Sequence, residues 1–199
     1  MSVTRKLLKR LGMRKLHREV QPARGRRGQR LERSTHVGFL VPAVDSVHRG
    51  QLKELALTLA ESADVDRWRI IADTGMTRKA HAKARAQRIQ RLGEGQQALP
   101  EFPQLAQVTC FWRDDCGSLG LPMAMPEELH DVDVLISLDQ DMSSLPLLAM
   151  LKRSRSSFKV GPLHADDGTL DFMLTWPDGG DMLSFVQLAF HYLKTLYLK

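Results

Sequence analysis

The stretch Val132–Asp141, VDVLISLDQD, decides the fold. Its apolar run has no helical period, and it ends at the polar cluster 139–144. A short run rich in β-branched residues is typical of a strand that is covered on both faces of a sheet. The stretch therefore predicts the central strand of an α/β sheet.

The residues after this strand predict a helix. Ser143 or Ser144 suits its N-cap, and Pro146 is tolerated in its first turn. Ligands of open α/β sheets bind beyond the carboxyl ends of such strands, so Asp139 and Asp141 are candidate pocket residues. The alternative is that both are only cap and turn residues, and capping preferences favour that alternative.

The upstream half of the chain supplies the remaining parallel strands. Short apolar runs at 36–41, 68–72 and 108–112 predict strands. Asp45 or Ser46 begins a predicted helix whose leucines recur at helical spacing. The connections lack a glycine-rich phosphate loop, which argues against the common nucleotide-dependent enzymes.

The downstream half predicts a different ending. Residues 158–163 and 170–176 alternate between apolar and polar, with Asp166-Asp167-Gly168 between them, which predicts an antiparallel hairpin. Asp181 then caps a final apolar helix that packs on the sheet. The expected fold is an α/β, Rossmann-like three-layer sandwich: a mostly parallel sheet, a C-terminal antiparallel hairpin and a final packing helix.

Charge divides the chain into two parts. The 199 residues have a formal net charge of +6, but residues 1–36 hold twelve lysines and arginines against two acids. That segment therefore carries +10, and the remainder carries −4. Such segregation indicates a polyanionic partner or an anionic surface.

The domain organisation follows from this division. Residues 1–35 are predicted to be a basic N-terminal arm, and residues 36–199 a single α/β domain. Within the arm, residues 3–20 are expected to form two short turns or a kinked helix broken at Gly12. Residues 21–30 are expected to be a flexible basic linker.

A second basic element, RKAHAKARAQRIQR, spans residues 78–91. Its alanines favour a helix, and its apolar bulk is small, so it is either solvated or bound to a polyanion. The cations of the arm and of this element that we expect to contact a polyanion are Arg5, Lys6, Lys9, Arg10, Arg14, Lys15, Arg24, Arg26, Arg27, Arg30, Arg78, Lys79, Lys83 and Arg85.

Four segments of the chain together resemble an uncharacterised bacterial family, a domain of unknown function. They are DVDVLISL (131–138), SSFKVGP (156–162), LDFMLTW (170–176) and FVQLAFHYLKTL (185–196). The resemblance spans roughly residues 36–197 and implies a small cytoplasmic α/β protein. It carries over no functional residue, and the arginine-rich segment 21–33 is not part of the pattern.

The remaining motifs give no catalytic or metal site. Cys110 and Cys116 lack the spacing of zinc ligands, and two cysteines exclude a disulfide scaffold. Lys159 and His164 join Asp139 and Asp141 as pocket candidates if the hairpin flanks the central strand. The competing interpretation makes Lys159 an edge-strand residue and His164 a turn residue, and we favour it.

The sequence thus predicts an uncharacterised protein; it leaves enzymatic activity undecided, with the balance against it, and it indicates no cofactor. The leading hypothesis is a cytoplasmic binding protein whose basic arm contacts RNA or the ribosome through phosphates. One alternative is a small-molecule-binding or enzymatic domain with a site at the end of the 132–138 strand. Another is peripheral association of the arm with an anionic membrane, and a targeting segment is a further interpretation of the arm.

Overall fold

A six-stranded parallel sheet forms the centre of the molecule. The computed structural model describes residues 3–19, 31–92, 105–163 and 168–195. The strand order is β3-β2-β1-β4-β5-β6, which is the order of a doubly wound α/β sheet. The strands are β1 (His36–Pro42), β2 (Arg67–Asp73), β3 (Val108–Phe111), β4 (Val134–Ser137), β5 (Phe158–Pro162) and β6 (Phe172–Leu174). The predicted α/β class is confirmed.

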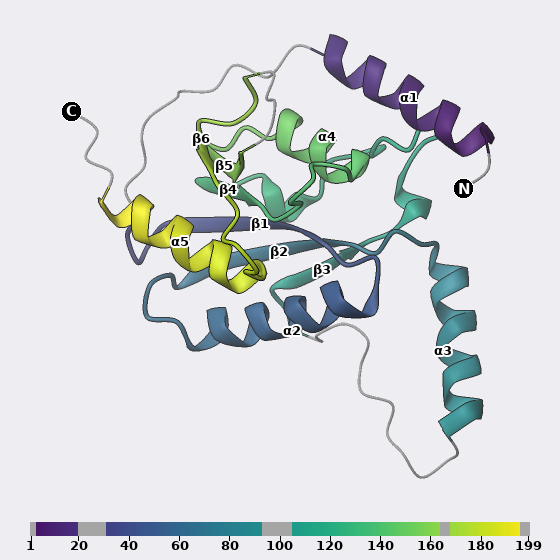
Figure 1. Ribbon diagram of the computed structural model, residues 1–199, viewed down its shortest axis with the longest axis horizontal. Helices are drawn as coiled ribbons and strands as arrows, with labels where there is room; N and C mark the ends of the chain where they lie inside the picture. The colour runs from purple at the N-terminus through teal and green to yellow at the C-terminus, as the bar shows by residue number, and fades with distance from the viewer. Residues whose placement is uncertain (1–2, 20–30, 93–104, 164–167, 196–199) are drawn as a thin grey trace.

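Helices cover both faces of the sheet (Figure 1). On one face, α2 (Ser46–Glu61) and α5 (Met182–Thr195) pack into the larger apolar core. On the other face, α4 (Leu145–Arg153) lies against the sheet. A further helix, α1 (Val3–Arg18), packs on the outside of α4. In the part of the chain that the structure describes, no helix has the length and apolar character needed to cross a membrane.

The helix starts agree with the predicted caps. The Asp45 side chain accepts the amide hydrogen of His48 at the start of α2, and Ser144 accepts that of Leu147 at the start of α4. Asp181 accepts the amide hydrogen of Ser184 at the start of α5. Each cap satisfies a backbone donor that the helix itself leaves without a partner.

The predicted antiparallel hairpin is wrong. β6 pairs with β5 in parallel, with Val160 opposite Phe172 and Pro162 opposite Leu174. The chain returns to the start of β5 before β6 begins. The hydrogen bond from the amide of Asp171, just before β6, to the carbonyl of Lys159 in β5 shows this return. Alternation along a strand shows which faces are buried, but it does not fix strand direction. The connection includes residues 164–167, which lie outside the described residues.

The predicted break at Gly12 is also wrong, because α1 is one helix of 16 residues. Gly12 is instead the point of closest approach to the body. A Cβ atom there would lie 2.5 Å from the carbonyl oxygen of Leu119 and 2.6 Å from a methyl carbon of Leu145. Glycine is needed for this close packing, not for a bend.

The second basic element forms α3 (Arg78–Leu92), which stands apart from the layers in Figure 1. Its first turn is held by the segment after β3: the Arg78 guanidinium bonds the carboxylate of Asp115 at 2.8 Å. The His81 ring packs on Trp112 with 5.0 Å between ring centroids. Residues 82–87 are exposed all round, as expected for a helix without an apolar stripe.

Candidate functional site

A pocket of about 540 Å³ opens at the carboxyl end of the sheet. Pro42, Asp73 and Leu138, which end or follow β1, β2 and β4, line it together with the first turns of α2, α4 and α5. The pocket lies where the strand order reverses, between β1 and β4. Doubly wound sheets bind their ligands at this position.

Two buried carboxylates meet at one serine in this pocket. The hydroxyl of Ser144 donates to Asp73 Oδ2 at 2.7 Å, and the amide of Ser144 donates to Asp139 Oδ2 at 2.6 Å. Asp73 also accepts the amide hydrogen of Gly75 at 3.0 Å. Both carboxylates are only 5% exposed. The loop after β4 and the end of β2 are therefore joined by polar contacts inside the cavity wall.

The buried position of Asp139 disfavours its ionised form. Burial raises the pKa of Asp139 above its ordinary value, and the negative charges of Asp141 and Asp73 act in the same direction. The amide hydrogens of Ser144 and Ser143 oppose this shift. A group that placed positive charge beside Asp139 would stabilise its ionised form.

The loop that carries these carboxylates has an unusual backbone. Met142 has a φ of 48°, in the left-handed region, although it is not glycine. Its amide donates to the carbonyl of Asp139 at 2.9 Å, which closes a tight turn between β4 and α4. Strained residues of this kind persist where the surrounding structure fixes them, and they occur most often at functional sites.

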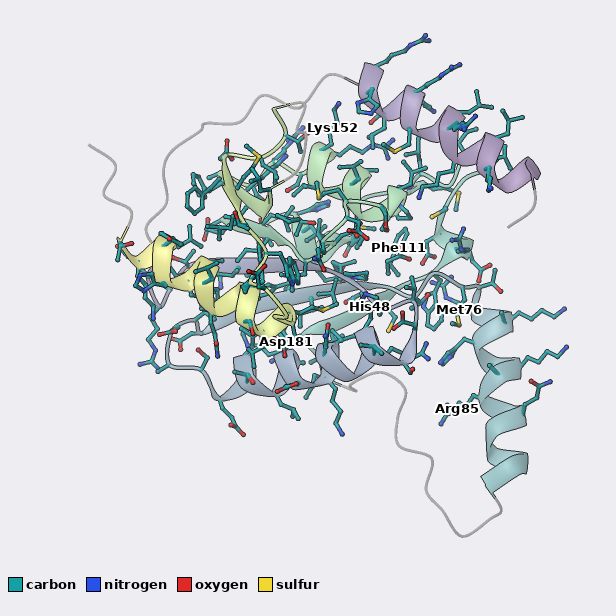
Figure 2. All side chains as sticks on the ribbon, viewed as in Figure 1. His48, Met76, Arg85, Phe111, Lys152 and Asp181 are labelled. Atoms are coloured by element: carbon teal, nitrogen blue, oxygen red, sulfur yellow. The ribbon has the colours of Figure 1, made fainter. Side chains whose placement is uncertain are left out.

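The three helix N-termini at the pocket are already occupied by side chains of the chain itself. Asp45, Ser144 and Asp181 each accept an amide hydrogen from the first turn of α2, α4 and α5, respectively. Figure 2 marks two of these first turns with His48 and Asp181. Phosphate groups usually bind to such free amides. A phosphate would therefore compete with these capping side chains for amide donors, and the carboxylates of Asp45 and Asp181 would repel it.

The remaining wall combines an aromatic ring, apolar side chains and two cations. Trp176 stacks on Phe185 at 4.5 Å between centroids, and its indole nitrogen donates to the carbonyl of Gly180 at 3.0 Å. Lys9 donates to the carbonyl of Ser143 at 2.7 Å, and Arg113 donates to the carbonyl of Gly75. The apolar lining residues include Leu8, Leu119, Leu145 and Met182.

The structure brings some of the predicted pocket residues together. Asp139 and Asp141 both line the pocket. Lys159 is fully buried elsewhere: it lies beside Leu135 in the sheet, and its Nζ donates to the carbonyl of Lys152 at the end of α4, 3.3 Å away. In Figure 2, Lys152 is on the opposite side of the sheet from Asp181. His164 lies outside the described residues.

Neither thiol is poised for nucleophilic chemistry. Burial raises the pKa of Cys110 and that of Cys116 to about 11, and nearby Asp73 adds to the effect at Cys116. The thiolate form, which is the reactive one, is therefore scarce at neutral pH. Among the described side chains, no group of three His, Cys, Asp or Glu residues is arranged to hold a metal ion.

The two basic helices form a second candidate site. On α1, a ridge of cations at four-residue spacing faces outward: Lys6, Arg10, Arg14 and Arg18 are exposed. None of these four pairs with a carboxylate among the described residues. Like charges at this spacing destabilise a helix, so a bound anion would relieve the repulsion.

The cations of α3 are equally exposed. Lys79, Lys83 and Arg85 make no ion pair with any carboxylate that the structure describes. Arg78 differs from them because it binds Asp115. Figure 2 shows Arg85 on the part of α3 that stands away from the sheet.

The other predicted polyanion contacts have four different outcomes. Lys15 is exposed on α1, whereas Lys9 is bound to a carbonyl at the pocket. The side chain of Arg5 is not described. Arg24, Arg26, Arg27 and Arg30, with the predicted flexible linker, lie outside the described residues.

The inner side of α1 attaches to the body by packing, and the residue after the helix, Glu19, forms an ion pair with Arg153. Leu16 is 2% exposed and packs with Leu121, Leu145 and Ala149. Arg153 of α4 donates to both carboxylate oxygens of Glu19, at 2.7 and 2.6 Å. Here the body supplies the cation and the N-terminal segment supplies the acid, so the exposed cations of α1 are left available.

Comparison with known proteins gives one match. The model of a family of unknown function (DUF6913) matches residues 129–196, roughly a third of the chain. The match confirms the expected resemblance to a family of unknown function over these residues. No significant match was found among the curated proteins or the solved structures. The matched segment contains Asp139, Ser144, Trp176 and Asp181 of the pocket, whereas α1 and α3 lie outside it.

Sequence reasoning missed several residues of the pocket. Asp73 directly follows the strand predicted at 68–72, so the rule that placed Asp139 at the carboxyl edge applies to it equally. Trp176 was assigned only to a strand, and the structure places it in the connection to α5. The sequence therefore contained a signal that places Asp73 at the pocket. Placing Trp176 there requires the direction of β6, which the sequence pattern does not give.

Proposed function

We propose that the protein is a cytoplasmic, non-enzymatic binding protein that contacts RNA through the exposed cations of α1 and α3. One observation carries the proposal: α3 stands clear of the body and presents Lys79, Lys83 and Arg85 without carboxylate partners among the described residues. A helix with alanines between its cations gains little from burial. Phosphates would compensate its charges.

The composition of α3 favours RNA over a membrane. The residues between its cations in the exposed part are alanine and glutamine, which offer nothing to insert into lipid. They also offer no aromatic ring for base stacking, so the contacts would be to the phosphate backbone of a structured RNA. Binding would then depend on salt and little on sequence.

The test is RNA affinity as a function of salt. Full-length protein would be titrated onto a short double-stranded RNA, with fluorescence anisotropy as the readout, from about 50 to 200 mM salt. The variant K83E/R85E reverses two exposed charges on α3. The matched control K53E/R67E makes the same charge change on two exposed cations of the body.

We expect the α3 variant to bind at least tenfold more weakly and to lower the log–log salt slope by about 2, since each phosphate contact contributes about 1. The control should retain most of the affinity. Equal losses in both variants, or no salt-dependent binding by the unmodified protein, would overturn the proposal. Tighter binding to anionic vesicles than to RNA at the same salt would assign the basic surface to a membrane.

A second candidate function uses the pocket. A cavity of about 540 Å³ at the switch point of a doubly wound sheet is the usual size and position of a small-molecule site. This supports a ligand-binding or enzymatic role at the end of β4. Among the described residues, the pocket is lined by none of α3, whereas α1 contributes Leu8 and Lys9 to its wall.

A further inference from the structure

The pocket accepts one class of charge better than the other. Its position is that of a nucleotide site, yet Asp45, Ser144 and Asp181 occupy the helix N-termini where phosphates bind. Asp139, Asp141 and Asp73 add negative charge to the same cavity. An anionic ligand would face repulsion from these carboxylates and would compete with the capping side chains for amide donors.

Two independent features of the cavity favour a cation. The first is the carboxylate pair Asp139 and Asp141, because bringing an ammonium group beside them would reverse the unfavourable effect of burial on Asp139. The second is the indole of Trp176, which lines the same cavity and is held in place by Phe185 and Gly180. Indole faces attract ammonium groups.

The cations that line the pocket make no described hydrogen bond to Asp139 or Asp141. Lys9 and Arg113 both donate to backbone carbonyls, those of Ser143 and Gly75. The Nδ1 atom of His48 lies 2.8 Å from the Asp45 carboxylate. Apolar contact is available beside the acids, from Leu119, Leu145 and Met182.

We propose that the pocket binds a small aliphatic amine, with its ammonium group between Asp139 and Asp141, in the same cavity as the Trp176 indole, and its hydrocarbon part against Leu145. This inference rests on the second candidate function and does not depend on RNA binding. Leu8 and Lys9 complete the wall on the side of α1, so the site requires the N-terminal helix.

The test uses three probes of equal chain length that differ in charge: butane-1,4-diamine, butane-1,4-diol and succinate. Each would be titrated into the full-length protein at low salt, with calorimetry and thermal unfolding as readouts. We expect the diamine to bind and to raise the Tm, because a ligand of the native state stabilises it by mass action. Succinate should do neither, and the diol should bind at least tenfold more weakly than the diamine.

The variants D139N and D141N locate the site. Asparagine at position 139 still accepts the amide hydrogen of Ser144, and Asp141 is exposed, so both variants should fold. We expect each to weaken diamine binding by about tenfold, which corresponds to about 1.4 kcal/mol. The control D131N removes an exposed acid just before β4, at the opposite end of that strand, and should bind like the unmodified protein.

Several results would overturn the inference. They are binding of succinate as tight as that of the diamine, equal binding of diamine and diol, and full diamine binding by both D139N and D141N. The two proposals can fail separately. D141N should retain RNA binding, and K83E/R85E should retain diamine binding.

Discussion

The two basic helices, α1 and α3, have similar length and charge but different attachments. The inner side of α1 packs on α4 through Gly12 and Leu16, and the Glu19–Arg153 ion pair fixes its end. By contrast, α3 is held through its first turn, and its exposed part has alanines where α1 has leucines and methionine. Basic composition therefore does not decide whether a helix docks. A helix docks when one of its sides carries residues that pack closely against the body.

The largest effect is expected from Gly12→Ala, which should detach α1. The added Cβ would lie within 2.6 Å of both Leu119 and Leu145, where no real Cβ fits. Alanine also raises intrinsic helix stability by about 1 kcal/mol, so the loss would be one of docking and not of helicity. Hydrogen exchange should show faster exchange of the α1 amides while the strands keep their protection.

The control is Gly50→Ala on α2, where a Cβ would meet nothing within 4 Å. This substitution should leave α1 docked and stabilise the protein by up to about 1 kcal/mol. If Gly12→Ala slowed exchange in α1 as Gly50→Ala should slow it in α2, the close contact at Gly12 would be refuted.

Arg153→Met should loosen α1 less severely. It removes a two-point hydrogen-bonded ion pair whose side chains are 27% and 25% exposed, and it leaves the apolar contacts of Leu16 in place. After allowance for solvent screening, we expect docking to weaken by about tenfold, or roughly 1–2 kcal/mol. The rate of protease cleavage between α1 and β1 would measure this weakening of α1 docking.

The comparison variant is Arg33→Met, which removes an ion pair with Asp66 that is 69% and 53% exposed. Pairs this exposed contribute about 0–1 kcal/mol, so its effect on the melting temperature should be small. A cleavage rate for Arg153→Met no higher than for Arg33→Met would mean that the ion pair does not hold α1.

Trp112→Leu should free the start of α3. The indole packs against His81 and lies 5.9 Å below the Arg78 guanidinium, and leucine offers no comparable face. Aromatic and cation–π contacts of this kind contribute about 0.5–1.5 kcal/mol each. We expect faster amide exchange in α3 and unchanged exchange in α1, which serves as the internal reference. Unchanged exchange in both helices would show that the Trp112 ring does not anchor α3.

The smallest effect is the pH dependence of α1 docking. The hydrogen bonds from Arg153 hold the pKa of Glu19 below its ordinary value, with help from the charges of Arg153, Lys15 and Lys152. A depressed folded-state pKa contributes stability that is present above the unfolded pKa of about 4.3 and is lost as the pH falls through the folded value. Docking should weaken below about pH 4, and this dependence should vanish in Arg153→Met.

Much of the fold follows from local patterns in the sequence. The apolar runs that became β1, β2 and β4, and the caps at Asp45, Ser144 and Asp181, depend on residues close in the chain. Two errors about the fold arose where a contact between residues far apart in the chain determines the local structure. Gly12 resembled a helix break because the sequence does not show that the Leu119 carbonyl approaches it. β6 resembled half of a hairpin because alternation is the same in both strand directions.

The pocket was predictable in part for the same reason. Asp139 and Asp141 follow the most apolar strand, so the switch-point rule located them. Lys159 was placed there only through the hairpin, and the parallel pairing of β5 sets it beside Leu135 in the sheet. The contribution of α1 to the wall could not be predicted, because nothing in residues 3–18 indicates which surface they cover.

That contribution has a thermodynamic consequence. Leu8 and Lys9 belong both to the wall of the cavity and to a helix whose opposite side is cationic. Any molecule whose binding moves α1 away from the body must also change the free energy with which a ligand binds in the cavity. Linkage is reciprocal, so a compound bound in the cavity must alter, by an equal factor, the affinity of a ligand that binds the outer, cationic side of α1.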